Sequence, residues 1–103
     1  MVAGADQGDA FKRDMGYSVE EFFRILPTAV GDHEYTAEGG RIVVRPRQQD
    51  RELVLQINVL PDRKIGMIRI PRIEVDFCFQ NFSTQERREF LVAFDRSFQR
   101  GGG

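Results

Sequence analysis

The sequence predicts a small α+β domain: an antiparallel sheet of four to five strands, with an N-terminal and a C-terminal helix packed on one face. Three observations lead to this fold class. A helix-forming segment with its own capping box stands near each end of the chain. The segments between them alternate apolar and polar residues, as strands do. The length of 103 residues suits a single domain with one modest core. The expected order is therefore helix, four strands, helix.

The first helix is predicted from the segment YSVEEFFRIL, which begins at Tyr17. Ser18 is a good N-cap, and Glu21 three residues later completes a capping box. Tyr17 and Phe22 occupy the two positions of a hydrophobic staple around that cap. Because proline removes a backbone hydrogen bond, the regular helix ends near Pro27, or kinks there and continues for one more turn.

The middle of the chain is predicted to form strands. In EYTAEGGRIVVRPR, the pair Gly39-Gly40 separates two short extended runs, which indicates a hairpin. In ELVLQINVLP, apolar residues recur at every second position and would share one face of the sheet; they are Leu53, Leu55, Ile57 and Val59.

The segment KIGMIRIPRIEVDFCFQNF contains a break in its alternation. Ile68 and Ile70 have one parity, whereas the apolar residues from Ile73 onward have the other. A slip of one residue turns every side chain to the opposite face, so one regular strand cannot hold both sets inward. Pro71 lies at the switch, and prolines in sheets occur at edges and bulges. The sequence predicts either one strand with a bulge at Pro71 or two strands that meet at a corner.

The second helix is predicted from STQERREFLVAFDRSFQR. Ser83 and Glu86 form its capping box, and Phe90, Phe94 and Phe98 recur every four residues along one apolar face.

The domain boundaries follow from these elements. Residues 1–16 are rich in Gly, Ala and Asp and are interpreted as a flexible leader, although residues 10–13 could add a strand. Residues 17–100 form the domain. Residues 101–103 are interpreted as a helix cap and a stub, with Gly101 as the left-handed residue after the helix. A reactive glycine tail, as in ubiquitin-like carriers, is disfavoured because those tails extend from a final strand.

Composition limits the classes of partner. Fifteen basic and sixteen acidic residues give a net charge of −1, which provides no basic footprint for nucleic acid or for an acidic membrane. One cysteine excludes an internal disulfide. No segment approaches the roughly 20 apolar residues of a membrane span. We expect a bacterial-type cytoplasmic protein that contacts no membrane.

The sequence predicts no catalytic, cofactor-binding or metal-binding residues, and hence no enzyme. Cys78 should face away from the core beside Asp76, where a neighbouring carboxylate would disfavour a thiolate. His33 lies in a turn between two acidic residues, but a zinc site would need more His or Cys ligands than this chain offers. Gly39-Gly40 matches no phosphate-binding loop.

The outward face of the sheet is the predicted binding surface. Arg is enriched at protein interfaces, so the candidate protein-binding residues are Arg45, Arg47, Arg69, Arg72, Glu74 and Asp76. Pro46 lies between two of these arginines and suits an edge strand, which could pair with another chain. Cross-strand ion pairs alone would also explain the charges.

The predicted function is a non-enzymatic interaction or accessory module that binds another protein or a second copy of itself. The alternative is a small-molecule or lipid-type binding protein with a Phe-lined cavity. Nucleic-acid binding is third, because a sheet that reads RNA needs exposed aromatic residues, and here the Phe residues have inward parity.

Overall fold

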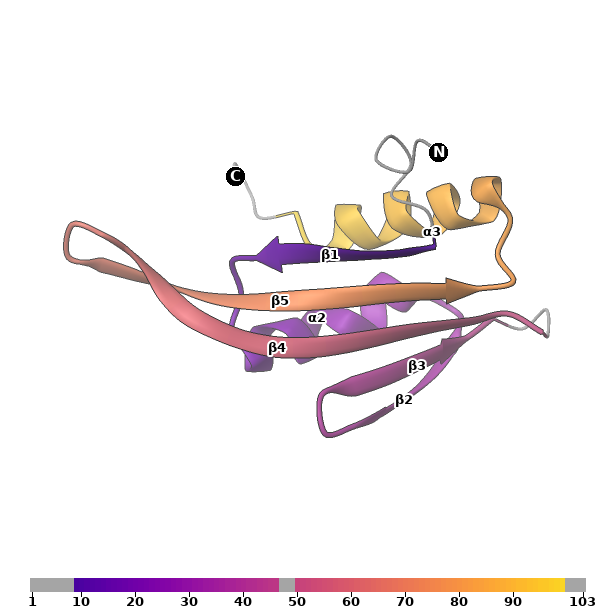
Figure 1. Ribbon diagram of the computed structural model, residues 1–103, viewed down its shortest axis with the longest axis horizontal. Helices are drawn as coiled ribbons and strands as arrows, with labels where there is room; N and C mark the ends of the chain where they lie inside the picture. The colour runs from indigo at the N-terminus through magenta and orange to yellow at the C-terminus, as the bar shows by residue number, and fades with distance from the viewer. Residues whose placement is uncertain (1–8, 47–49, 100–103) are drawn as a thin grey trace.

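The computed structural model describes residues 9–46 and 50–99 and confirms the α+β class (Figure 1). Two helices accompany one five-stranded antiparallel sheet. The elements are, in chain order, β1 (Ala10–Met15), α2 (Val19–Val30), β2 (Glu34–Glu38), β3 (Arg41–Arg45), β4 (Glu52–Ile65), β5 (Ile68–Gln80) and α3 (Thr84–Ser97).

Residues 10–13, left open as a possible strand, belong to β1, so the element order begins with a strand and not with the predicted helix. Residues 10–15 pair along their whole length with β5, from Ala10 opposite Cys78 to Met15 opposite Ile73. The strand was hard to predict because Arg13 occupies an inward-facing position between Phe11 and Met15. Its guanidinium lies 5.6 Å from the Phe11 ring centre and forms an ion pair with Asp95 of α3. Tertiary contacts therefore hold a charged residue where a sequence pattern expects an apolar one.

The strand order in the sheet is β1-β5-β4-β3-β2, and all pairings are antiparallel. Strand β3 therefore lies inside the sheet, between β2 and β4. The interpretation of Arg45 and Pro46 as an edge segment is wrong, because β2 follows α2 and adds to the sheet outside β3. Arg47 lies outside the described residues.

Two tight turns connect neighbouring strands. The predicted hairpin at Gly39-Gly40 is confirmed: β2 and β3 pair from Glu38 opposite Arg41, and both glycines have positive φ, at 58° and 85°. Two positive φ angles in a two-residue loop suit the twist of the flanking strands. The turn between β4 and β5 is Gly66-Met67, in which only the glycine has positive φ, at 61°. A glycine in the first central position is typical of a type II′ turn.

The break in alternation near Pro71 is confirmed as a bulge, but the extra residue belongs to the partner strand. Strand β5 runs without interruption from Ile68 to Gln80. The pairing with β4 shifts between Leu60 opposite Arg72 and Arg63 opposite Ile70. Two residues of β4 therefore face Pro71 alone. Such a bulge increases the local twist of the sheet, and Figure 1 shows the β4–β5 hairpin twisting as it leaves the body of the molecule.

Both capping boxes form as predicted. The backbone N–H of Glu21 donates to the Ser18 hydroxyl, and Glu86 makes the same bond with Ser83, each at 3.1 Å. The glutamate side chains accept in return from the serine backbone N–H groups. Helix α2 continues through Pro27 to Val30, the longer of the two predicted alternatives.

Helix α3 ends earlier than predicted. Its last residue is Ser97 and its C-cap is Phe98, so Gly101 is not the residue that stops it. The Phe98 ring is buried in the core, and its carbonyl accepts a hydrogen bond from the Tyr17 hydroxyl. The chain thus leaves the helix at a residue that is anchored in the core. Gly101–Gly103 lie outside the described residues.

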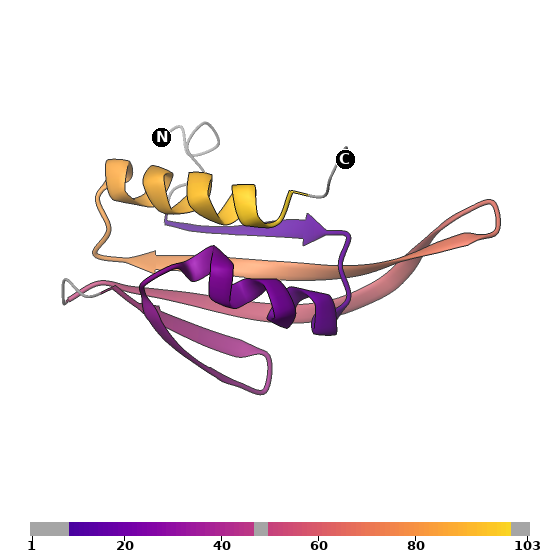
Figure 2. The same ribbon diagram turned by 180° about the vertical axis from the view of Figure 1, so that it is seen from behind.

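The core is one cluster that joins the inward face of the sheet to residues of both helices. Phe94 of α3 packs edge-on against Phe77 of β5, with ring centres 5.4 Å apart, and lies 6.4 Å from Phe22 of α2. Figure 2 shows α2 in front of the sheet and α3 alongside β1, and Figure 1 shows α2 behind the sheet. Within the described part of the chain, no helix is long and apolar enough to cross a membrane.

Candidate functional site

The outer face of the sheet is the side that points away from the core cluster. The register of the four strand pairs places its side chains in rows that run across the strands. Figure 1 looks onto this face. The charge and polarity of each part of the outer face therefore depend on which residues are neighbours in a row.

The first row is made of small side chains and carries no charge. It crosses all five strands in register, from Ala10 on β1 through Cys78, Val54 and Val43 to Thr36 on β2. We call it the central row. Cys78 is exposed, as predicted from its parity between the buried Phe77 and Phe79.

The next row toward the β4–β5 turn carries charges of both signs, and we call it the mixed-charge row. Its members are, in order across the sheet, Lys12, Asp76, Gln56, Arg41 and Glu38. Opposite charges in direct cross-strand positions stabilise a sheet. The two acidic and two basic residues are thus distributed as Lys–Asp on one side of Gln56 and Arg–Glu on the other.

Asp76 is the most unusual member of this row. Its Oδ1 atom is buried and, within residues 9–46 and 50–99, accepts no hydrogen bond from the protein. A buried carboxylate oxygen without a donor costs free energy. A hydrogen-bond donor from a partner molecule would therefore stabilise Asp76 by bonding to this oxygen.

Two ion pairs flank these rows. Arg45 Nε lies 3.5 Å from Glu52 Oε1, across strands β3 and β4. Arg72 donates two hydrogen bonds to Asp14, and its Nη2 lies 2.5 Å from Oδ2. The bond from Arg72 holds the pKa of the Asp14 carboxyl below its usual value, and the nearby charge of Arg63 acts in the same direction. The expected cross-strand ion pairing is thus present for Arg45 and Arg72.

The predicted binding residues separate into three groups. Arg45, Arg72, Glu74 and Asp76 lie on the outer face, and Asp76 alone among them belongs to the mixed-charge row. Arg69 lies near the far end of the β4–β5 hairpin, beyond the register shift. Arg47 lies outside the described residues. Lys12 and Asp14 were missed because their strand was interpreted as leader; the alternation of Lys12 and Asp14 with Phe11 and Met15 was the available signal.

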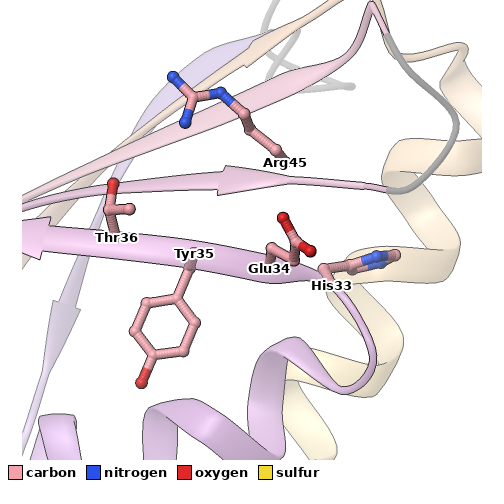
Figure 3. Close-up of a pocket in the computed structure, with 5 residues that line it drawn as sticks. All are labelled: His33, Glu34, Tyr35, Thr36 and Arg45. Carbon is pink, nitrogen blue, oxygen red and sulfur yellow. The ribbon is translucent and has the colours of Figure 1, made fainter.

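A second feature is a hollow of about 400 Å³ at the free edge of β2 (Figure 3). Its lining residues are His33, Glu34, Tyr35, Thr36 and Arg45. Figure 3 shows Tyr35 pointing to the helix side of the strand and Thr36 and Arg45 to the other. The hollow thus has lining residues on both sides of the strand, and none of them is Phe.

The single histidine has a packing role. The His33 ring stacks on Phe90 of α3, with centres 6.0 Å apart. Burial lowers the pKa of His33, and the charge of Arg51 adds to this effect, although Asp32 opposes it. Within the described ranges, no three His, Cys, Asp or Glu side chains gather closely enough to hold a metal ion.

Comparison with other proteins adds no further constraint: no protein-family model, curated protein or solved structure matches this chain.

Proposed function

We propose that this protein is a non-enzymatic interaction module, and that its partner on the outer face is a second copy of the chain. In this proposal both helices pack on one face of the sheet, and the opposite face is free to dock. The shared core cluster and the ring contacts of Phe22, Phe77 and Phe94 support that arrangement.

The observation that carries the proposal is the charge order of the mixed-charge row. A two-fold axis that runs along β4, between two outer faces, brings β1 opposite β2 and β5 opposite β3 of the second copy. Each row then faces itself in reverse order. Lys12 meets Glu38 of the second copy, and Asp76 meets Arg41 of the second copy. A surface that contacts itself through a two-fold axis must be self-complementary in this way.

Other features of the face agree with this docking. The central row would place Val54 against Val54 of the second copy and Cys78 against Val43 of the second copy, which forms a small apolar centre. Arg41 of the second copy would supply a donor near the unpaired oxygen of Asp76. Two sheets packed face to face in this manner normally lie about 10 Å apart with strands nearly aligned.

The size of the face predicts a weak to moderate affinity. Five strands about 4.8 Å apart and seven residues of about 3.3 Å each give about 24 by 23 Å, or about 550 Å² per copy. Two copies would bury about 1,100 Å², near the lower limit for a specific complex. We therefore expect a dimer that dissociates on dilution.

A non-enzymatic role is supported by the positions of the two residues best suited to chemistry. Cys78 lies on the outer face, whereas His33 stacks on Phe90 on the helix side of the sheet. They cannot act as a nucleophile and base on one substrate, because such a pair must lie within hydrogen-bond reach.

The test reverses one charge at a time. Arg41→Glu would face Asp76 of the second copy, and Asp76→Arg would face Arg41 of the second copy, so each variant should be monomeric by sedimentation equilibrium. An equimolar mixture of the two variants should form a heterodimer, because both contacts then join opposite charges. Arg24→Glu, on an exposed position of α2, is the matched control and should dimerise like the wild type.

Three results would contradict this proposal. The wild type could be monomeric at all concentrations up to the millimolar range, or both charge-reversal variants could dimerise as well as the control. The mixture could also fail to restore association although both variants are folded by circular dichroism.

A further inference from the structure

The β4–β5 hairpin extends well beyond the body of the molecule. Strands β4 and β5 have 14 and 13 residues, whereas the other three strands have five or six. We call residues 61–70 the arm. It begins at the register shift, and every residue from 61 to 69 is exposed. Figure 1 and Figure 2 both show this hairpin projecting past all other elements.

The tip of the arm is apolar. Ile65 pairs directly with Ile68, and the turn between them is Gly66-Met67. The exposed fractions are 56% for Ile65, 99% for Met67 and 62% for Ile68. Val59, just before the arm, is exposed as well, so that four of the five large exposed hydrophobic residues found in the described ranges lie on this one hairpin. Such a concentration is typical of a binding surface.

A basic collar lies immediately behind the tip. Lys64 is directly opposite Arg69, and Arg63 is the next residue along the strand. Asp62 is the one acidic residue of the arm. Like charges in direct cross-strand positions repel each other and destabilise a hairpin. This cost is removed when an anionic surface contacts the collar. The net charge of −1 for the whole chain conceals this local excess.

From this arrangement we propose that the arm binds an anionic lipid surface, with its apolar tip inserted between the headgroups. Apolar and basic residues follow one another along the arm within about 7 Å, the rise of two strand residues. The interface of a bilayer has the same order, with acyl chains below and anionic headgroups above, and inserted segments reach about 5–10 Å into it. The stems of Lys64 and Arg69 would lie along the apolar region while their charges remain at the headgroups.

A groove in DNA is the alternative anionic partner, but the arm suits it less well. Contact with DNA draws most of its affinity from many phosphate contacts, whereas the arm offers three basic residues and exposes three apolar ones at its leading end. A few basic residues suffice at a membrane, since each adds about fivefold to binding at an anionic surface.

The test is co-sedimentation of the full chain with vesicles of phosphatidylcholine, alone or mixed with phosphatidylglycerol. We expect binding to the mixed vesicles, little binding to phosphatidylcholine alone, and a decrease with added salt. Lys64→Glu combined with Arg69→Glu should weaken binding at least about 25-fold, from roughly fivefold or more for each residue. Met67→Ser should also weaken it, because the tip then loses its most exposed apolar group.

Two controls match these variants in exposure and chemistry. Val92→Ser removes the large exposed hydrophobic residue of α3, and Arg88→Glu reverses an exposed charge on the same helix. Both should bind vesicles like the wild type. Arg41→Glu, which tests the outer face, leaves the arm intact and should still bind. The Arg41→Glu variant should thus lose dimers without losing vesicle binding, so that failure of the dimer proposal and failure of the membrane proposal can be distinguished.

Several results would overturn the proposal. The wild type could fail to sediment with anionic vesicles, or could sediment equally well after the arm substitutions. Equal binding to both kinds of vesicle would exclude the role of the basic collar. A DNA duplex could also be bound in place of vesicles and lose binding with the arm variants, which would assign the arm to nucleic acid.

Discussion

Phe94 packs helix α3 against the sheet. Its side chain is fully buried, with 0% exposed. Its ring centre lies 4.7 Å from that of Phe98, 5.4 Å from Phe77 and 5.9 Å from Phe90. A Phe94→Ala substitution would remove a ring that lies against Phe90 one turn earlier in α3, Phe98 at the C-cap and Phe77 of β5.

We expect this substitution to lower the free energy of unfolding by about 3–5 kcal/mol. The loss combines the transfer free energy of the missing ring with the cost of the cavity that the surrounding rings cannot fill. A domain of this size has about 5–15 kcal/mol of stability in total. With a urea dependence of about 1–3 kcal/mol/M, the midpoint of unfolding should fall by about 2 M.

The assay is equilibrium unfolding in urea, followed by far-ultraviolet circular dichroism, because the chain has no tryptophan. Phe94→Leu keeps most of the volume and should lose clearly less stability than Phe94→Ala. Val92→Ala, at an exposed position on the same helix, should change stability by less than about 0.5 kcal/mol. A loss below about 1 kcal/mol for Phe94→Ala would refute the packing described above, since it would equal a surface effect.

Three further predictions concern the cap, the first strand and the histidine. Ser83→Ala removes the acceptor for the Glu86 backbone N–H and should cost about 1 kcal/mol, seen as a melting temperature about 4–8 °C lower; an unchanged melt would exclude a role for the cap. Asp9→Asn weakens the 3.0 Å contact with Arg87, whose exposed fraction is 5%, and should lower stability by about 1–2 kcal/mol in urea unfolding, whereas Asp62→Asn on the arm should have no effect. Burial lowers the pKa of His33 below 6.5 in the folded state, so the unfolded chain takes up the proton at a higher pH than the folded chain does. The contribution of neutral His33 to stability is therefore complete above pH 6.5 and declines as the pH falls below that value. His33→Asn should flatten this part of the stability profile, and an identical slope in both proteins would show that other groups cause it.

Local signals in the sequence predicted the elements that depend on neighbours along the chain. The capping boxes at Ser18 and Ser83 join residues three positions apart, and the turn at Gly39-Gly40 depends on its own two glycines. Strand β1 could not be predicted in the same way. Arg13 can face inward because its guanidinium forms an ion pair with Asp95, 82 residues later, and lies over the ring of Phe77.

The binding face was predictable in part. Parity alone indicated that Arg45, Arg72, Glu74 and Asp76 face outward, but not which residues lie beside them. The rows depend on register, and register follows from turns and from pairings between distant strands. The bulge shows the same limit: the break near Pro71 was visible in β5, while its extra residue lies in β4, opposite, and could be assigned only from the pairing of Leu60 with Arg72.

The pairing of β1 with β5 also affects the order in which this chain can fold. Ala10 finds its partner at Cys78, and Phe22 of α2 finds its neighbour at Phe94. At a synthesis rate of about 5–20 residues per second, about 3–14 s pass between the synthesis of β1 and α2 and the synthesis of the residues that cover them. In that interval their apolar side chains are open to other chains and to chaperones. Contacts of such long sequence separation also slow folding of the released chain. A truncation after β4 would leave β1 without its partner strand and Phe22 of α2 without its neighbour Phe94.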